Sequence, residues 1–185
     1  VSAMIDPYGR MLESIPLGEA GYADAALPAG ALLYEENQGF GAIMARFQDE
    51  RLAVAAMSVG MAETALQVTL THVRARQAFD GTLWDLQATR QRLSWLNAQT
   101  NGARALVHET AIRLARGEDC AAEVLMAKSL AGETLLDVIR GCLQLHGGLG
   151  FLEGETIERI GRDARVMTIG GGATEVLLEQ VARRM

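Results

Sequence analysis

Residues 50–79 read ERLAVAAMSVGMAETALQVTLTHVRARQAF, and this stretch decides the fold. Its small and apolar residues recur at spacings of three and four positions: Leu52, Ala55, Val59, Ala62, Leu66, Thr69 and Val73. This is the period of an amphipathic helix, so we expect one helix from Gly39 to about Phe79. A helix of about 40 residues measures roughly 60 Å, and only other long helices can cover such a face.

A second stretch with the same period follows Gly81 and runs to Gly117. Thr82 followed by Asp85 resembles a capping box, the arrangement that satisfies free N–H groups at the start of a helix. The apolar face of this predicted helix consists of Leu86, Leu93, Leu96, Thr100, Ala103, Val107 and Leu114.

A third stretch begins after Asp119, a residue type that caps helices, and the sequence Gly147-Gly148-Leu149-Gly150 ends it. Its face consists of Val124, Ala127, Ala131, Leu135, Val138, Cys142 and Leu145. Short helices over about 154–161 and from Thr174 onward complete the set. Tight turns join these elements, which predicts an all-α fold, an up-down bundle of the four-helix type.

The first 36 residues have a different character. All three prolines, Pro7, Pro16 and Pro28, lie there, with turn sequences at 6–9 and 27–30 around short apolar pieces. So few strand residues do not form a stable sheet alone. We therefore interpret residues 1–36 as the incomplete end of a β domain and residues 37–185 as the helical bundle domain.

Composition narrows the function. Hydrophobic residues make up 49% and aromatic residues 5% of the 185 residues, so the core is aliphatic. The formal net charge of −6 argues against a nucleic-acid partner. Cys120 and Cys142 share no metal or disulfide motif and fit a reducing compartment, so we expect a cytoplasmic protein. We find no apolar run near the ~20 residues of a membrane span and no signal peptide at the start.

The residue pattern does not match a metal site or the active site of a serine hydrolase. A di-iron bundle needs Glu-x-x-His pairs, but Thr69, Ala105 and Leu143 stand three positions before the three histidines. Zinc-ligand spacing and a nucleophile elbow for a catalytic serine are also missing. We therefore predict no metal site.

Four local features remain, and each alone has an ordinary structural explanation as a solvated charge, a basic helix end or a glycine cap. They are Glu50 on the first helix, the segment 74–79 together with Gln87, the segment 143–151, and the run Gly170-Gly171-Gly172 before the last helix. Glycines there allow φ > 0, and the N–H groups of the following helix suit an anionic or carbonyl oxygen.

The order and spacing of these features resemble the C-terminal domain of the acyl-CoA dehydrogenase family, FAD-dependent flavoproteins. The resemblance extends from about Leu27 to Met185 and includes Leu27-Pro28-Ala29 and the segments 35–40, 162–165 and 169–176. It covers the bundle and the end of the middle β domain only. It implies α,β-dehydrogenation of an acyl-CoA thioester, FAD as cofactor, electron-transfer flavoprotein as electron acceptor, and a homo-oligomer, either dimer or tetramer.

The resemblance also suggests the catalytic base. Many family members carry a glutamate in the loop before the last helix, where this chain has Gly171. In an isovaleryl- and long-chain-like branch the base lies on the first long bundle helix directly before an arginine, which Glu50-Arg51 matches. Losing the loop carboxylate makes room for one on the helix, so we predict Glu50 as the base. Asp49 is the nearest rival but lies about 100° round the helix.

Further roles follow from the same resemblance. Arg51 and Gly172 match substrate-side positions, and His146 matches a packing position. The cofactor-binding positions are Arg76 at the FAD pyrophosphate, Phe79 and Gln87 near the adenosine half, Gln144 and Gly148 on a loop reaching a neighbouring subunit's FAD, and Ala173 and Glu175 at the start of the last helix. Ala173 stands where the family usually has threonine.

Two other interpretations stay open. Because most of the β domain has no counterpart here, the chain is also consistent with a non-catalytic helical module that only oligomerises. An acyl-CoA oxidase relative would differ only in oxygen access, which the sequence does not reveal.

Overall fold

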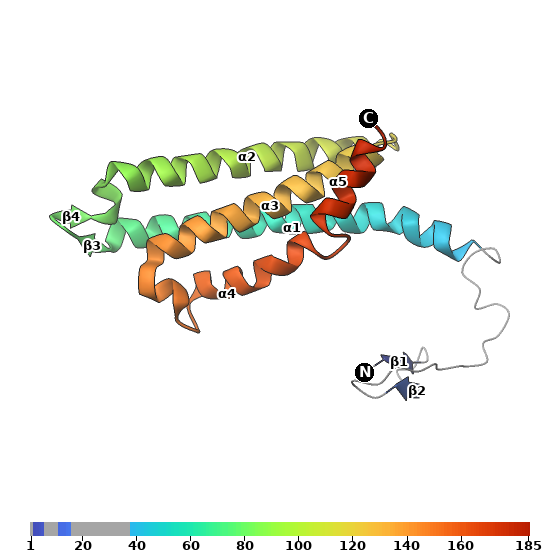
Figure 1. Cartoon of the computed structure of the whole chain (residues 1–185), viewed down its shortest axis with the longest axis horizontal. Coiled ribbons are helices and arrows are strands. Elements are labelled where there is room, and N and C mark those ends of the chain that lie inside the picture. Colours follow the sequence, from blue (N-terminus) through green and yellow to red (C-terminus); the bar gives the residue numbers. More distant parts are fainter. Residues whose placement is uncertain (1, 6–10, 16–37) are drawn as a thin grey trace. The chain divides into compact units, whose positions relative to one another are not determined.

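The computed structural model describes residues 2–5, 11–15 and 38–185 (Figure 1). The chain divides into two compact units, Val1–Ala42 and Ile43–Met185. In the first unit, β1 (Ser2–Ile5) pairs antiparallel with β2 (Met11–Ile15), and the register shifts between Met4 and Ile5. The predicted turns at 6–9 and 27–30, and the predicted domain boundary at 36/37, lie outside the described residues.

Three long helices and two short ones follow, which confirms the predicted all-α bundle with a short β segment before it (Figure 1). The long helices are α1 (Gly39–Ala75), α2 (Gln87–Ala115) and α3 (Ala121–His146). The short ones are α4 (Thr156–Ala164) and α5 (Thr174–Ala182). α4 lies a few residues later than the predicted 154–161.

The connection between α1 and α2 differs from the prediction. α1 ends at Ala75, and β3 (Gln77–Ala78) pairs with β4 (Gly81–Thr82) in a short hairpin. At its tip the backbone of Phe79 has φ of 58°, which no helix accommodates. The hairpin turn thus overrides the helical period of the preceding sequence.

The predicted capping box is present directly after this hairpin. The backbone N–H and the hydroxyl of Thr82 donate to Oδ2 of Asp85 at 2.7 and 2.8 Å. It opens a single 3₁₀ turn, Leu83–Asp85, and α2 begins two residues beyond that turn. Asp119 likewise accepts a hydrogen bond from the N–H of Ala121 at the start of α3.

The core lies around α3, which packs against α2, α4 and α5. Its main cluster combines Ala62 and Ala65 of α1, Leu96 of α2, Leu135, Val138, Ile139 and Cys142 of α3, and Ile157, Ile160 and Ala164 of α4. α2 and α3 approach closely, since a Cβ on Gly141 would lie 2.6 Å from Cδ1 of Leu96. Small residues therefore set the spacing of the bundle.

One sequence expectation needs correction. Among the described residues, α1 is long and apolar enough to pass a length-and-composition test for a membrane span, although we expected no such run. Core helices pass the same test, and α1 places Ala62 and Ala65 in the bundle core. Of the most apolar window of α1, 33% is buried, so packing within the bundle accounts for only part of these apolar positions.

The core predicts a sharp contrast between two leucines of α3. Leu135 is 0% exposed, whereas Leu130 is 46% exposed. We expect Leu135→Ala to lower the free energy of unfolding by about 2–5 kcal/mol, because it leaves a cavity. Leu130→Ala should change it by less than about 1 kcal/mol. Urea unfolding followed by circular dichroism measures both, and equal losses would contradict the assigned core.

Candidate functional site

The glycine run forms a turn that requires glycine. Gly171 and Gly172 have φ of 70° and 118°, a region that residues with a side chain rarely adopt. A Cβ on Gly172 would also lie 2.7 Å from Cδ2 of Leu177. This confirms the expectation of positive φ in the run. The turn leads directly into α5 through Ala173, which has extended backbone angles.

Two buried cations hold this turn. Nε of Arg51 donates to the carbonyl oxygen of Gly171 at 2.9 Å, and Nζ of Lys128 donates to the carbonyl oxygen of Gly172 at 2.6 Å. Arg51 of α1 is 5% exposed, and Lys128 of α3 is 0% exposed. The Arg51 bond spans 120 residues of sequence. It joins the first long helix to the turn before the last one.

The charges around the turn are unbalanced. Burial is the main cause that lowers the pKa of both Arg51 and Lys128, and the charge of Arg51 lowers that of Lys128 further. Glu50 acts in the opposite direction on Arg51, as Glu133 and Glu175 do on Lys128. Within residues 38–185 neither cation forms an ion pair with a carboxylate. The turn therefore lies against a region of positive charge.

Glu50 lies next to this region but is exposed to solvent. A Cβ on Gly171 would lie 3.4 Å from Cγ of Arg51, so a side chain in the loop would meet α1 at this level. Asp49 is exposed as well, with Oδ2 3.7 Å from Nη1 of Arg46. The described residues do not desolvate either carboxylate, so any desolvation there requires another covering group.

The remaining predicted cofactor residues form a second group at the other end of α1. Arg76, Phe79 and Gln87 are exposed around the β3–β4 hairpin, and Phe79 is 88% exposed. Gln144 and Gly148 are exposed where α3 passes into the 3₁₀ turn Gly147–Phe151.

A pair of histidines joins these two segments. The rings of His72 in α1 and His146 in α3 stack with centroids 4.1 Å apart and planes 16° apart. His146 therefore packs, as expected, and its buried Nε2 has no hydrogen-bond partner among the residues that the structure describes.

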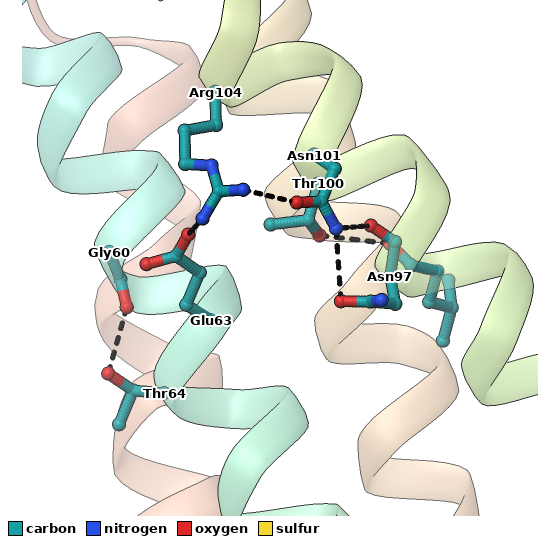
Figure 2. A network of polar contacts seen from close by, with 8 residues as sticks. Gly60, Glu63, Thr64, Asn97, Thr100, Asn101 and Arg104 are labelled. Carbon is teal, nitrogen blue, oxygen red and sulfur yellow. Dashed lines mark hydrogen bonds and ion pairs between the residues drawn. The ribbon is translucent and has the colours of Figure 1, made fainter.

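The structure does not bring the two groups together. Ala173 is half-buried and Glu175 exposed at the start of α5, near Arg51, whereas Arg76 lies roughly 25 residues further along α1, or about 37 Å. A pocket of about 400 Å³ between α1 and α2 contains none of the predicted site residues. Its rim carries a polar network in which Arg104 links Glu63 to Asn101 (Figure 2).

Three long helices, two short ones and a glycine turn before the last helix make this a helical-bundle domain, and it can be compared with known families. The family described as "Acyl-CoA dehydrogenase, C-terminal domain" matches residues 37–185. The chain therefore belongs to the acyl-CoA dehydrogenase family.

Individual relatives agree with this assignment. The long-chain specific acyl-CoA dehydrogenase of Sus scrofa is 37% identical over 96% of the chain, which spans 42% of that relative's length. A crystal structure of a probable acyl-CoA dehydrogenase from Mycobacterium abscessus has a TM-score of 0.85 and 36% identity, covering 88% of this chain and 43% of that one. The structure of butyryl-CoA dehydrogenase from Megasphaera elsdenii has a TM-score of 0.83 and 30% sequence identity. The match covers 85% of this chain and 41% of that one.

Sequence reasoning missed Lys128 and His72. Position 128 lies four residues after Val124 on the apolar stripe of α3, so its helical phase indicated burial even though lysine is usually exposed. No sequence pattern around His72 indicated that it stacks on another ring, because its partner lies in another helix.

The histidine stack predicts a pH dependence of stability. Burial lowers the pKa of His146 to about 4 and also lowers that of His72. Between about pH 4 and 6.5 the unfolded chain therefore binds more protons than the folded one. We expect stability to be complete above pH 6.5 and to decrease by up to about 3 kcal/mol as the pH falls through this window.

Urea titrations between pH 4 and pH 8 measure the effect. His146→Phe should reduce the slope of stability against pH, whereas a change of the exposed His108 to Asn should leave it as it is. A slope that is identical in all three chains would show that the stack does not control it.

Proposed function

We propose that this chain takes part in FAD-dependent α,β-dehydrogenation of an acyl-CoA thioester, with Glu50 as the base. The observation that supports the proposal is the contact between Arg51 and Gly171, because it holds Arg51, the residue after Glu50 on α1, against the turn that lacks the family's loop glutamate. The position of the carboxylate on α1 favours the isovaleryl- and long-chain-like branch.

Glu50 accepts the proton from the α carbon at a carboxylate oxygen. That role requires that substrate and cofactor exclude water from the carboxylate once they cover it. Arg51, fixed by the carbonyl of Gly171, holds the helix surface beside Glu50 in place, and Gly172 stands at the substrate side of the turn, where its positive φ shapes the backbone. FAD, when bound, supplies the hydride acceptor for the β hydrogen.

The residues of this chain fit a flavin. The exposed guanidinium of Arg76 suits a pyrophosphate, and the exposed rings and amides of Phe79, Gln87 and Gln144 suit an adenosine. Gly148 allows close approach of the backbone. Ala173 offers its N–H but not the hydroxyl of the usual threonine, and Glu175 follows in the first turn of α5.

The separation of about 37 Å between these groups favours a homo-oligomer. One copy supplies Ala173 and Glu175 near the reactive ring, and another copy supplies the hairpin and the Gln144 loop at the nucleotide half. Electron-transfer flavoprotein is the electron acceptor that we propose, and we propose a cytoplasmic location. Either a dimer or a tetramer allows two copies of the chain to contribute residues to one FAD.

A second candidate is a helical module that oligomerises without catalysis. The exposure of Glu50 favours it, because the described residues do not enclose this carboxylate. A purified protein that stays colourless and ignores added FAD would support the module.

The first test is a chimera that joins residues 1–185 to the portion of the pig long-chain relative outside the matched region. The flavin-loaded chimera should be yellow and should bleach anaerobically when an acyl-CoA is added. Glu50→Gln should slow bleaching by about 10²–10⁴-fold without loss of colour, because the base is gone and the fold is kept. Asp49→Asn is the matched control and should bleach like the parent; bleaching of the Glu50→Gln chimera at the parental rate would eliminate Glu50 as the base.

The second test concerns the pyrophosphate. Arg76→Met in the same chimera should weaken FAD binding by about tenfold or more, because a charge-assisted hydrogen bond is lost. Arg74→Met is the control, since the guanidinium carbon of Arg74 lies 5.2 Å from the centroid of the Trp84 ring. Flavin fluorescence titration measures both, and equal affinities would remove Arg76 from the site.

A further inference from the structure

Lys128 is a buried cation that the proposed mechanism does not use. Its side chain lies on the apolar stripe of α3, is 0% exposed, and donates to the carbonyl oxygen of Gly172. The neighbouring carbonyl of Gly171 is held by Arg51 of α1. Two cations from two long helices thus bind two consecutive carbonyls of one turn.

If Lys128 only filled space in the core, its burial would cost more free energy than the burial of an apolar side chain. An ammonium that leaves water and gains no ion pair, as Lys128 gains none within residues 38–185, loses solvation free energy, and the nearby charge of Arg51 adds repulsion. An apolar side chain of similar length would fill the same space without that cost. The hydrogen bond to Gly172 is what Lys128 adds.

That bond fixes the direction of one peptide group. In a trans peptide the C=O and the following N–H point in opposite directions, and the described residues contain no cis peptide bond. Because Lys128 draws the carbonyl of Gly172 inward, the N–H of Ala173 points away from the ammonium. It lies at the start of α5, where no side chain caps the helix.

We propose that Lys128 is a positioning residue that orients the peptide group between Gly172 and Ala173 and presents the N–H of Ala173 as a donor. The inference rests on the proposed function in one respect, namely that this donor meets the flavin. Ala173 has no side-chain hydroxyl, so its backbone N–H is the hydrogen-bonding group left at this position. Arg51 fixes the preceding peptide group in the same manner.

The test uses the 185-residue chain and Lys128→Met, which keeps the length of the side chain and removes the donor. Hydrogen exchange should become at least about tenfold faster at the amides of residues 171–176, because the turn opens more often. The urea midpoint should be unchanged or higher, because a buried charge without an ion pair is replaced by an apolar group. Ser129→Ala, a change of the adjacent buried residue, should alter neither quantity.

Unchanged exchange at 171–176 would overturn the proposal. Faster exchange throughout the bundle with a lower urea midpoint would overturn it as well, because Lys128 would then support the whole core. If the methionine variant does not fold, nitrogen-15 spectra of the parent chain decide the matter. A slowly exchanging ammonium bonded to Gly172 supports the proposal, and a freely exchanging one contradicts it.

A second readout separates this inference from the proposed function. In the chimera, Lys128→Met should weaken FAD binding about tenfold, whereas Ser129→Ala should not. Failure of the Glu50→Gln test would remove the catalytic proposal but leave the exchange result on the isolated chain intact. Normal FAD affinity in the Lys128→Met chimera would remove the flavin donor role.

Discussion

The hydrogen bond from Nε of Arg51 to the carbonyl of Gly171 joins parts of the chain that are 120 residues apart. It holds Arg51, the residue after Glu50 on α1, against the turn that precedes α5, and Lys128 adds a second bond from α3 to the same turn. Both bonds need carbonyls that point inward, and this requires the positive φ values of Gly171 and Gly172. The candidate site therefore depends on glycines that carry no chemistry themselves.

Much of the fold could be predicted from residue spacing, because apolar faces repeat with the helical period over three long segments. The end of α1 could not, because Phe79 continues the helical pattern while the hairpin at Gly81 bends the backbone. In the site, the positive φ of the glycine run could be predicted from the glycines themselves, whereas the role of Glu50 comes from the family resemblance and stays a prediction. Lys128 and the His72–His146 stack did not, because their partners lie in other helices and only packing reveals them.

The two groups of predicted cofactor residues lie far apart along the bundle. The charged turn contacts Arg51 and Lys128, which lie in the N-terminal halves of α1 and α3. The hairpin and the Gln144 loop follow the C-terminal ends of these helices, where His72 and His146 stack. At Gly141, where an added Cβ would lie 2.6 Å from Cδ1 of Leu96, α3 packs closely against α2. The bundle thus carries two distant contact surfaces on one rigid frame.

The tip of the β3–β4 hairpin has a consequence for association. Phe79 is 88% exposed, yet its backbone is held at φ of 58° by paired strands on both sides. A group that covers this ring meets an aromatic surface whose attachment to the chain is already ordered. Association at the hairpin therefore loses less conformational entropy than it would at a ring on a freely moving loop.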